Sequence, residues 1–436
     1  MKKILAILIV FLFMIQGFGC SSTEYTPKNL PDYESTKDSL HMQIGAWHMP
    51  ALTKEDFQDY KDAGFNAAYF GGQDEVHLGG ANFQKALDLC EEFDINAIMS
   101  IRNQLGHEYT EDFSGYEYAK YIHVYDEPNA SVFPKLAAEA ERIYNTYGEN
   151  VVFDVNLFPM YASENSLGVN SYDEYIRLFV EQVLSKVKGE KRLSVDYYPL
   201  AMTNGKRYLP VTWLRNLEIM AKYAKEYDLT THMFIQSMPF GKSNNVVPTD
   251  EDFSLQVYTS LAYGMKEISH FCYVTPGVGG DFSEEQVAII DRNNEKTVLY
   301  ERAKKINELI AKIDNVYLSF DWVGTMPVLG SNTQRNNLFR MLEEPLYVED
   351  LDNIKSIKSD NDIIVGCFED EQKNDAYMIV NFNETSLNLT CNVNLEFMKY
   401  RNALVYVNGE KTVRSLKDGK LDLALKSGEG VFVIPY

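Results

Sequence analysis

Cysteine and basic residues are scarce in this sequence, and each shortage excludes a class of protein. The 436 residues include five cysteines, none in a Cys-x-x-Cys pair, so no zinc site or thiol redox motif is indicated. Lysine and arginine number 41 against 63 acidic residues, which leaves a net charge of −22. Binding to nucleic acid or to an anionic membrane surface therefore has no electrostatic support, and a neutral or cationic ligand fits better.

Signatures of a bound metal or cofactor are also missing. His48 and His232 have no partner histidine at metal-ligand spacing, and a structural role is the commoner one for such residues. The glycines of Gly277–Gly280 are not followed by Lys-Ser or Lys-Thr, as a phosphate-binding loop would require. We therefore expect no metal and no cofactor.

Long apolar runs are lacking except at the N-terminus, where Ile4–Ile15 follows two lysines. This run is too short for a membrane span and is typical of a signal peptide. Gly19 and Cys20 resemble the bacterial lipobox, although Gly17 replaces the usual leucine. We expect cleavage after residue 19, lipidation of Cys20, a signal region over 1–20 and a polar tether over 21–40. The protein would then be extracytoplasmic and lipid-anchored to a bacterial membrane, most simply the outer one.

Between residues 41 and 315, short apolar runs alternate with amphipathic segments. The predicted strands are Gln43–Met49, Ala67–Gly71, Ala97–Arg102, Tyr121–Tyr125, Val151–Leu157, Leu193–Tyr198, His232–Gln236 and Ile268–Thr275. Helical periodicity separates most of them, whereas Asn103–Ala119 shows none. Parallel strands need such crossovers, and no Gly-rich dinucleotide loop supports an open, doubly wound sheet. We predict an α/β fold, a (β/α)₈ TIM barrel.

After residue 315 the pattern changes to short strands separated by Asp, Asn, Gly and Lys turns. This predicts a small C-terminal antiparallel β-sandwich over 316–436. The four cysteines after Cys20 are expected to be buried thiols, although Cys367 and Cys391 could meet across a sheet.

Polar and aromatic residues gather at the ends of the predicted barrel strands, which meet on one face of a barrel. The candidates for substrate binding are Trp47, His48, Arg102, Asn156, Tyr197, Tyr198, Gln236 and Tyr273. The aromatic rings could instead plug the barrel mouth. Carboxylates, aromatic rings and amides around one cavity are typical of a sugar-binding pocket.

Asp126 and Glu127 stand at the end of the fourth strand, just before Pro128. One alternative is a helix N-cap. Adjacent strand residues point to opposite faces, so only one of the two acids is expected to face a central site. Hydrolysis of a glycosidic bond needs a carboxylic acid and usually a second carboxylate. Glu127 is the candidate acid, Asp196 the candidate second carboxylate, and Asp126 a supporting residue; Asp196 could instead anchor a loop.

This pattern resembles clan A glycoside hydrolases, in particular the family 42 β-galactosidase-like barrels of lipoproteins in glycan-degrading bacteria. The likeness lies in Glu127, in the aromatic ends of strands six and eight, and in the C-terminal antiparallel domain. The Asp126-Glu127 pair is also similar to that of family 20 and family 123 hexosaminidases, in which the acetamido group of the substrate attacks. By that likeness Asp126 would orient the acetamido group and Tyr198 would hydrogen-bond its carbonyl.

Two positions depart from the clan A pattern, because Asp126 replaces an asparagine and Gln236 replaces the nucleophilic glutamate. A neutral amide cannot form a glycosyl ester, so retention, inversion through Asp196 and substrate assistance remain alternatives. We expect a glycoside hydrolase that acts on an oligosaccharide or a glycan fragment, with a carbohydrate and a lipid anchor as partners. The alternative is a non-catalytic glycan-binding surface lipoprotein, which Gln236 favours.

Overall fold

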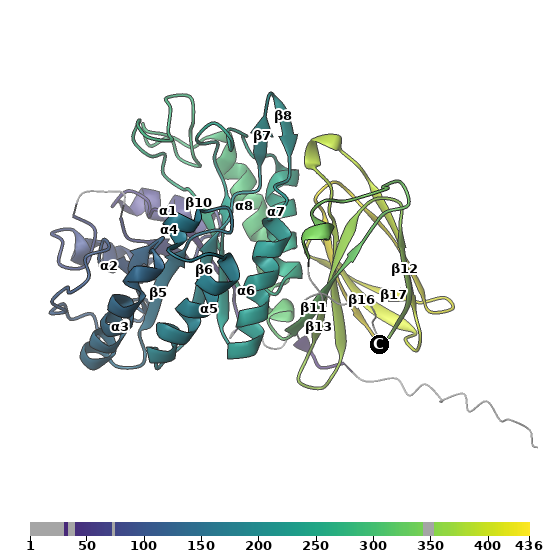
Figure 1. Cartoon of the computed structure of the whole chain (residues 1–436), viewed down its shortest axis with the longest axis horizontal. Helices are drawn as coiled ribbons and strands as arrows, with labels where there is room; N and C mark the ends of the chain where they lie inside the picture. The colour runs from purple at the N-terminus through teal and green to yellow at the C-terminus, as the bar shows by residue number, and fades with distance from the viewer. Residues whose placement is uncertain (1–29, 34–39, 72–74, 343–352) are drawn as a thin grey trace, which may run out of the picture.

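The computed structural model describes residues 30–33, 40–71, 75–342 and 353–436. The predicted signal peptide, Cys20 and most of the predicted tether lie outside the described residues. Among the helices that the structure describes, none is long and apolar enough to cross a membrane. Figure 1 shows the helix-covered barrel on one side and the C-terminal sheets on the other.

Eight parallel strands close into a barrel in the order β1-β10-β9-β6-β5-β4-β3-β2. The strands are β1 (Gln43–Trp47), β2 (Ala67–Tyr69), β3 (Asn96–Ser100), β4 (Tyr121–Asp126), β5 (Val152–Leu157), β6 (Arg192–Asp196), β9 (Thr230–Gln236) and β10 (Glu267–Phe271). Each predicted strand corresponds to one of them, so the predicted TIM barrel is confirmed.

Helices cover the outside of the barrel (Figure 1). They are α1 (Lys54–Asp62), α2 (Phe83–Glu92), α3 (Phe133–Tyr147), α5 (Tyr172–Gln182), α6 (Trp213–Tyr227), α7 (Asp250–Ala262) and α8 (Val298–Ala311). Shorter elements are α4 (Glu164–Leu167), α9 (Asp314–Tyr317), the hairpin β7 (Ala201–Thr203) and β8 (Lys206–Tyr208), and the 3₁₀ turns η2 (Ala130–Val132), η3 (Leu184–Lys186), η4 (Phe339–Met341) and η5 (Thr385–Leu387). No helix forms in the fully described connection 101–120 between β3 and β4, as expected.

Strand residues alternate between the barrel interior and the helix-covered outside. On β5, Phe153 and Val155 belong to the core beneath the helices. Between them Asp154 points inward, where it meets Arg192 of β6 and His123 of β4. Where this alternation continues to the carboxyl end of a strand, every second residue there turns towards the barrel interior.

The C-terminal part forms two antiparallel sheets, as predicted. The larger sheet has the order β11 (Asp321–Val328), β13 (Ile363–Glu369), β14 (Asp375–Asn381), β19 (Gly430–Pro435), β16 (Asn402–Val407) and β17 (Glu410–Ser415); the smaller has β12 (Ile354–Ser359), β15 (Cys391–Phe397) and β18 (Lys420–Leu425). Apolar residues of both sheets share one core, so the sheets pack face to face. Cys367 and Cys391 are both buried free thiols and do not form a disulfide.

Helix α7 joins the barrel to the larger C-terminal sheet. It contacts β9 on one side and β13, β14 and β19 on the other, and residues on all its faces are buried, as expected for a helix enclosed by apolar neighbours. A side chain at Gly366 would come within 2.3 Å of the carbonyl oxygen of Ala262, so a glycine is needed where the sheet approaches the helix. The two domains therefore share a continuous core.

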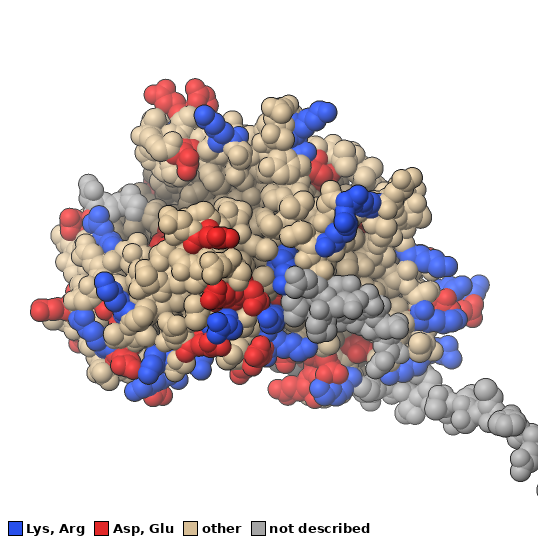
Figure 2. Space-filling view, in the orientation of Figure 1, with Lys and Arg blue, Asp and Glu red and all other residues tan. Residues whose placement is uncertain are grey.

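Charged side chains of both signs are mixed on one face of the molecule. Figure 2 shows Lys and Arg side chains interspersed with Asp and Glu on the face that it presents. Together with the net charge of −22, this distribution offers no basic surface for a polyanion on that face.

Candidate active site

The end of β6 sends Asp196 and Tyr198 into the barrel mouth and Tyr197 away from it. Asp196 and Tyr198 line the same cavity. The Tyr197 ring packs in the outer core, and its hydroxyl lies 2.7 Å from Oγ1 of Thr212. The period-2 alternation of the strand thus separates two adjacent tyrosines that the sequence placed together.

At the end of β4, Asp126 and Glu127 both line the cavity, contrary to the expectation that only one of them would. The pairing of β4 with β5 shifts register between His123 and Tyr125. This bulge lets Tyr125 pack against the outer core, so that Asp126 faces inward. Glu127 follows with a φ of +50° and has left the strand direction altogether.

Neither Asp126 nor Glu127 caps the 3₁₀ turn η2 that follows them. Asn129 caps η2, because its Oδ1 accepts the Ser131 N–H at 3.0 Å. A left-handed backbone costs a residue with a side chain about 1 kcal/mol, and such strain persists where the surrounding structure enforces it, commonly at functional sites. The N–H of Glu127 donates to the carbonyl of Asn156 at 2.8 Å, which is one such restraint.

A cavity of about 380 Å³ opens at the carboxyl ends of the strands. It is lined by Trp47, Asp126, Glu127, Asn156, Tyr161, Asp196, Tyr198, Phe234, Phe240, Asn244, Phe271, Asp281 and Phe282. Four of these side chains are carboxyl groups and seven are aromatic rings, whereas none is a lysine or an arginine. In the described part of the chain, no three His, Cys, Asp or Glu side chains converge as ligands for a metal ion.

One amide connects two of the carboxyl groups. Nδ2 of Asn156 lies 3.2 Å from Oδ1 of Asp126 and 3.2 Å from Oδ1 of Asp196. These two carboxyl oxygens are therefore no more than twice that distance apart. Ser194 donates its hydroxyl to Oδ1 of Asn156 at 3.0 Å, which holds the amide nitrogen towards the acids. Hydrogen bonds from Asn156 favour the ionised form of both acids.

The three acids at the strand ends perturb one another. Burial, followed by the charge of Asp126, raises the pKa of Glu127 to about 7. Burial, followed by the charges of Glu127 and Asp126, raises the pKa of Asp196 well above its usual range. Burial also raises the pKa of Asp126, although His123 and Asn156 oppose this shift. A cluster of this kind retains protons near neutral pH, and the protons are shared.

A second compartment of about 420 Å³ adjoins the cavity and shares Trp47 and Asp126 with it. It contains the predicted binding residues His48 and Arg102, and in addition His123. The predicted residues Trp47, His48, Arg102, Asn156 and Tyr198 therefore surround one two-part cleft, together with the three predicted acids.

The predicted binding residues Tyr197, Gln236 and Tyr273 line neither compartment. Gln236 is fully buried, and its Nε2 donates to the carbonyls of Met238 and Asn244 at 3.2 and 2.8 Å. Tyr273 packs edge-on against Tyr60 behind the barrel wall. Gln236 shapes the loop after β9, and Tyr273 is a core residue.

Several lining residues were not identified from the sequence. Phe234 and Phe271 could have been found, because alternation along β9 and β10 turns them inward. Tyr161, Asp281 and Phe282 come from loops that follow β5 and β10. Asp281 and Phe282 could have been found as an acid and a ring next to Gly280 in a long connection after the last strand, where binding residues are often placed.

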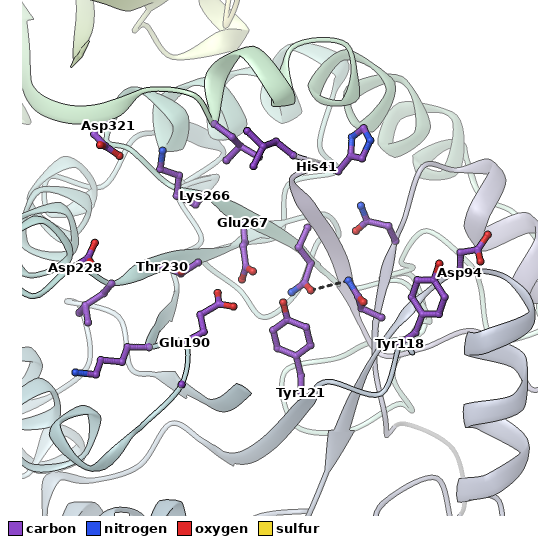
Figure 3. Close-up of a pocket in the computed structure, with 18 of the residues that line it drawn as sticks. His41, Asp94, Tyr118, Tyr121, Glu190, Asp228, Thr230, Lys266, Glu267 and Asp321 are labelled. Atoms are coloured by element: carbon purple, nitrogen blue, oxygen red, sulfur yellow. Dashed lines mark hydrogen bonds between the residues drawn. The ribbon is translucent and has the colours of Figure 1, made fainter. Parts of the chain in front are cut away.

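A wider cavity, of about 1150 Å³, opens at the amino ends of the strands. Figure 3 shows Tyr121, Glu190 and Glu267 directed towards its centre, with Lys266 and Asp321 at its edge. Arg192 pairs with Glu267 at 2.5 Å, so the most buried acid at this end has a cation beside it. Asp196, a buried acid without an ion pair among the described residues, lies at the carboxyl ends, where TIM barrels build their active sites.

Comparisons with known proteins identify no family for this chain. No protein-family model matches the sequence, and no curated protein matches it. A family 5 glycoside hydrolase from Bacteroides vulgatus is similar in structure, with 13% identity, 91% of this chain and 89% of that chain covered, and a TM-score of 0.45.

Two further solved structures are similar. An α-amylase from Anoxybacillus has 9% identity over 90% of this chain and 98% of that chain, with a TM-score of 0.42. A family 27 β-L-arabinopyranosidase from Geobacillus stearothermophilus has 10% identity over 92% of this chain and 97% of that chain, with a TM-score of 0.42. Because identities and TM-scores are this low, the evidence for function is the cleft itself.

Proposed function

We propose that this protein is a glycoside hydrolase that uses Glu127 as its general acid at the carboxyl end of the barrel. The observation that carries the proposal is the clustering of Asp126, Glu127 and Asp196 in one aromatic cavity without a lysine or arginine. Aromatic faces stack on the C–H faces of sugars, and paired carboxyl groups are the usual catalysts of glycoside hydrolysis.

Glu127 has the properties of a proton donor. Its pKa of about 7 leaves much of it protonated at neutral pH, as a general acid requires. Among the hydrogen bonds of the described residues, none engages its carboxyl group, which is therefore available to a glycosidic oxygen. The proton of Glu127 would pass to that oxygen as its bond to the anomeric carbon breaks.

Asp196 is the proposed base. Burial raises the pKa of Asp196, and the charges of Glu127 and Asp126 raise it further, whereas the Asn156 amide favours the ionised form. Protonation of Glu127 removes one of these two charges. The proposed productive form is protonated Glu127 with ionised Asp196, which accepts a proton from water as the water attacks the anomeric carbon. Direct attack by water inverts the anomeric carbon, so we propose inversion.

The position of Gln236 does not argue against catalysis. Its amide is used to donate to two loop carbonyls, and its side chain does not line the cavity. A neutral residue there therefore reflects the structure of the loop. Placing Asp126, Glu127 and Asp196 together without a cation costs free energy, and acid catalysis gives a use for the proton that such a cluster retains.

The test compares Glu127→Gln with Glu226→Gln, which removes an exposed glutamate from α6. On a panel of aryl glycosides, Glu127→Gln should lower kcat/KM by about 10² to 10⁴, while Glu226→Gln should not. The loss should be smaller for dinitrophenyl glycosides, because that leaving group needs no proton. Equal turnover by wild type and Glu127→Gln would contradict the proposal.

The stereochemistry of the first product separates the mechanisms. Inversion of the anomeric carbon, followed by NMR, is the expected result. Retention limited to N-acetylated sugars would transfer the main role to Asp126 as the residue that orients the acetamido group.

We also propose, from the sequence alone, that the protein is exported and anchored through Cys20.

A further inference from the structure

We propose that the second compartment binds a hexuronic acid unit. Arg102 would form an ion pair with its carboxylate, and Nε2 of His123 would form a hydrogen bond with one of its hydroxyl groups. This inference rests on the proposed function, because it names the class of sugar next to the bond that is cleaved. Its evidence is separate and comes from the residues that line the second compartment alone.

His123 has a ring nitrogen without a partner. Its Nδ1 lies 2.6 Å from Oδ2 of Asp154, and both side chains are buried. Burial would raise the pKa of Asp154, but Arg192 and His123 hold it well below its usual range. Because ionised Asp154 accepts the Nδ1 proton, Nε2 is the ring nitrogen left for a ligand.

Nε2 of His123 is buried and has no hydrogen-bond partner in the structure, although His123 lines the compartment and is 2% exposed. Buried polar atoms are nearly always hydrogen-bonded. The barrel thus holds an imidazole nitrogen without a partner in a side chain that lines this compartment.

Arg102 supplies the positive charge. Its side chain is exposed at the mouth of the compartment, and none of the ion pairs within the described residues includes it. The turn that carries it is well held, because Ser100 Oγ accepts the Arg102 N–H at 3.0 Å and Gln104 N–H donates to Ile101 at 3.0 Å. Arg102 and Asn103 have φ of +53° and +58°. This left-handed backbone is unfavourable for arginine, and such strain is common at functional sites.

Two acids, Glu75 and Asp126, line the compartment with Arg102, and neither forms an ion pair with it among the described residues. A carboxylate oxygen of Glu75 instead lies 3.6 Å from Nε2 of His77. Burial, together with His123, lowers the pKa of His48 to about 3, so His48 is neutral. Asp126 stands in the wall shared with the acidic cavity.

The two compartments together orient such a ligand. Four carboxyl groups and no lysine or arginine line the first cavity, so it offers no cation to an anionic sugar. In the second compartment the ring would pack on Trp47, with hydroxyls towards His123 and Asp126 and the carboxylate towards Arg102. The planar guanidinium matches a carboxylate with two parallel hydrogen bonds.

The experiment measures binding without turnover, using the full chain with Glu127→Gln. Methyl β-D-glucuronide and methyl β-D-galacturonide are titrated by calorimetry against methyl β-D-glucoside and methyl β-D-galactoside. At least one uronide should bind about tenfold more tightly than its neutral counterpart. That ratio should fall as salt rises from 20 to 200 mM, because a surface charge is screened.

Arg102→Gln should bring the ratio close to one and change the affinity for the neutral glycoside less than about twofold. Arg102→Lys should keep part of the preference. The control is Arg414→Gln, which removes an exposed arginine from β17 and should keep the full preference.

Equal affinity for uronide and neutral glycoside would overturn this inference, as would a preference that survives Arg102→Gln. Tighter binding of glucose 6-sulfate than of either uronide would overturn the assignment to a carboxylate. These outcomes are independent of the hydrolysis assay. A uronide preference without hydrolysis of any glycoside would contradict the proposed function alone, and hydrolysis without the preference would contradict this inference alone.

Discussion

Replacement of Glu127 by glutamine should stabilise the folded protein at alkaline pH and have little effect at acidic pH. The folded state holds the Glu127 proton more tightly than the unfolded chain, because burial and then Asp126 raise its pKa from 4.5 to about 7. The contribution of the protonated form to stability is therefore complete below pH 4.5 and is lost as the pH rises through about 7.

The size of the effect follows from that shift. One pKa unit corresponds to about 1.4 kcal/mol, so the rise to about 7 amounts to about 3 kcal/mol. Glu127 lies at a partly open cavity mouth, where solvent screening reduces the figure to about 2 kcal/mol. Glutamine keeps the shape of a protonated glutamic acid and carries no charge at any pH. The variant therefore does not lose this part of the free energy of unfolding as the pH rises.

The assay is urea denaturation of wild type, Glu127→Gln and the exposed control Glu226→Gln from pH 4 to pH 8.5. The free energy of unfolding of Glu127→Gln, relative to wild type, should be near zero at pH 4. It should increase by about 2 kcal/mol by pH 8. A difference that does not change with pH, or that decreases as the pH rises, would refute this reasoning.

Three further predictions concern Asn156, Gln236 and Cys20. Asn156→Ala removes the amide that favours ionised Asp196; the acidic limb of the kcat/KM profile should move to higher pH, with about a tenfold loss at pH 6. Gln236→Glu places a buried carboxylate against the carbonyls of Met238 and Asn244; it should destabilise the fold by about 3 kcal/mol in urea denaturation and should not raise turnover. Cys20→Ser should abolish incorporation of labelled palmitate and release the protein from the membrane fraction, and continued labelling would exclude Cys20 as the acceptor.

The strands of the barrel could be predicted because their signal is local. A buried parallel strand is a short apolar run, and the helix that follows shows a 3.6-residue period. The same local reasoning identified Asp126, Glu127 and Asp196, since acids at strand ends are visible as positions in the sequence.

Local reasoning failed where a single residue changed the register. The bulge between His123 and Tyr125 reverses the expected orientation of Asp126, and nothing in the sequence marks it. The position of Gln236 at a strand end indicated a ligand contact, whereas its side chain lines neither compartment. The loop carbonyls that receive its hydrogen bonds come from residues whose positions only the folded loop determines.

The sequence by itself determined the fold class and which residues carry acids and rings at the strand ends, because both depend on spacing along the chain. Only the tertiary structure decided that Glu127 has a raised pKa, since burial and the approach of Asp126 are properties of the folded cavity. It also decided that Arg102 and His123, from neighbouring strand ends, share one compartment. Contacts between strands determine charge, orientation and access, and these contacts exist only when the barrel closes.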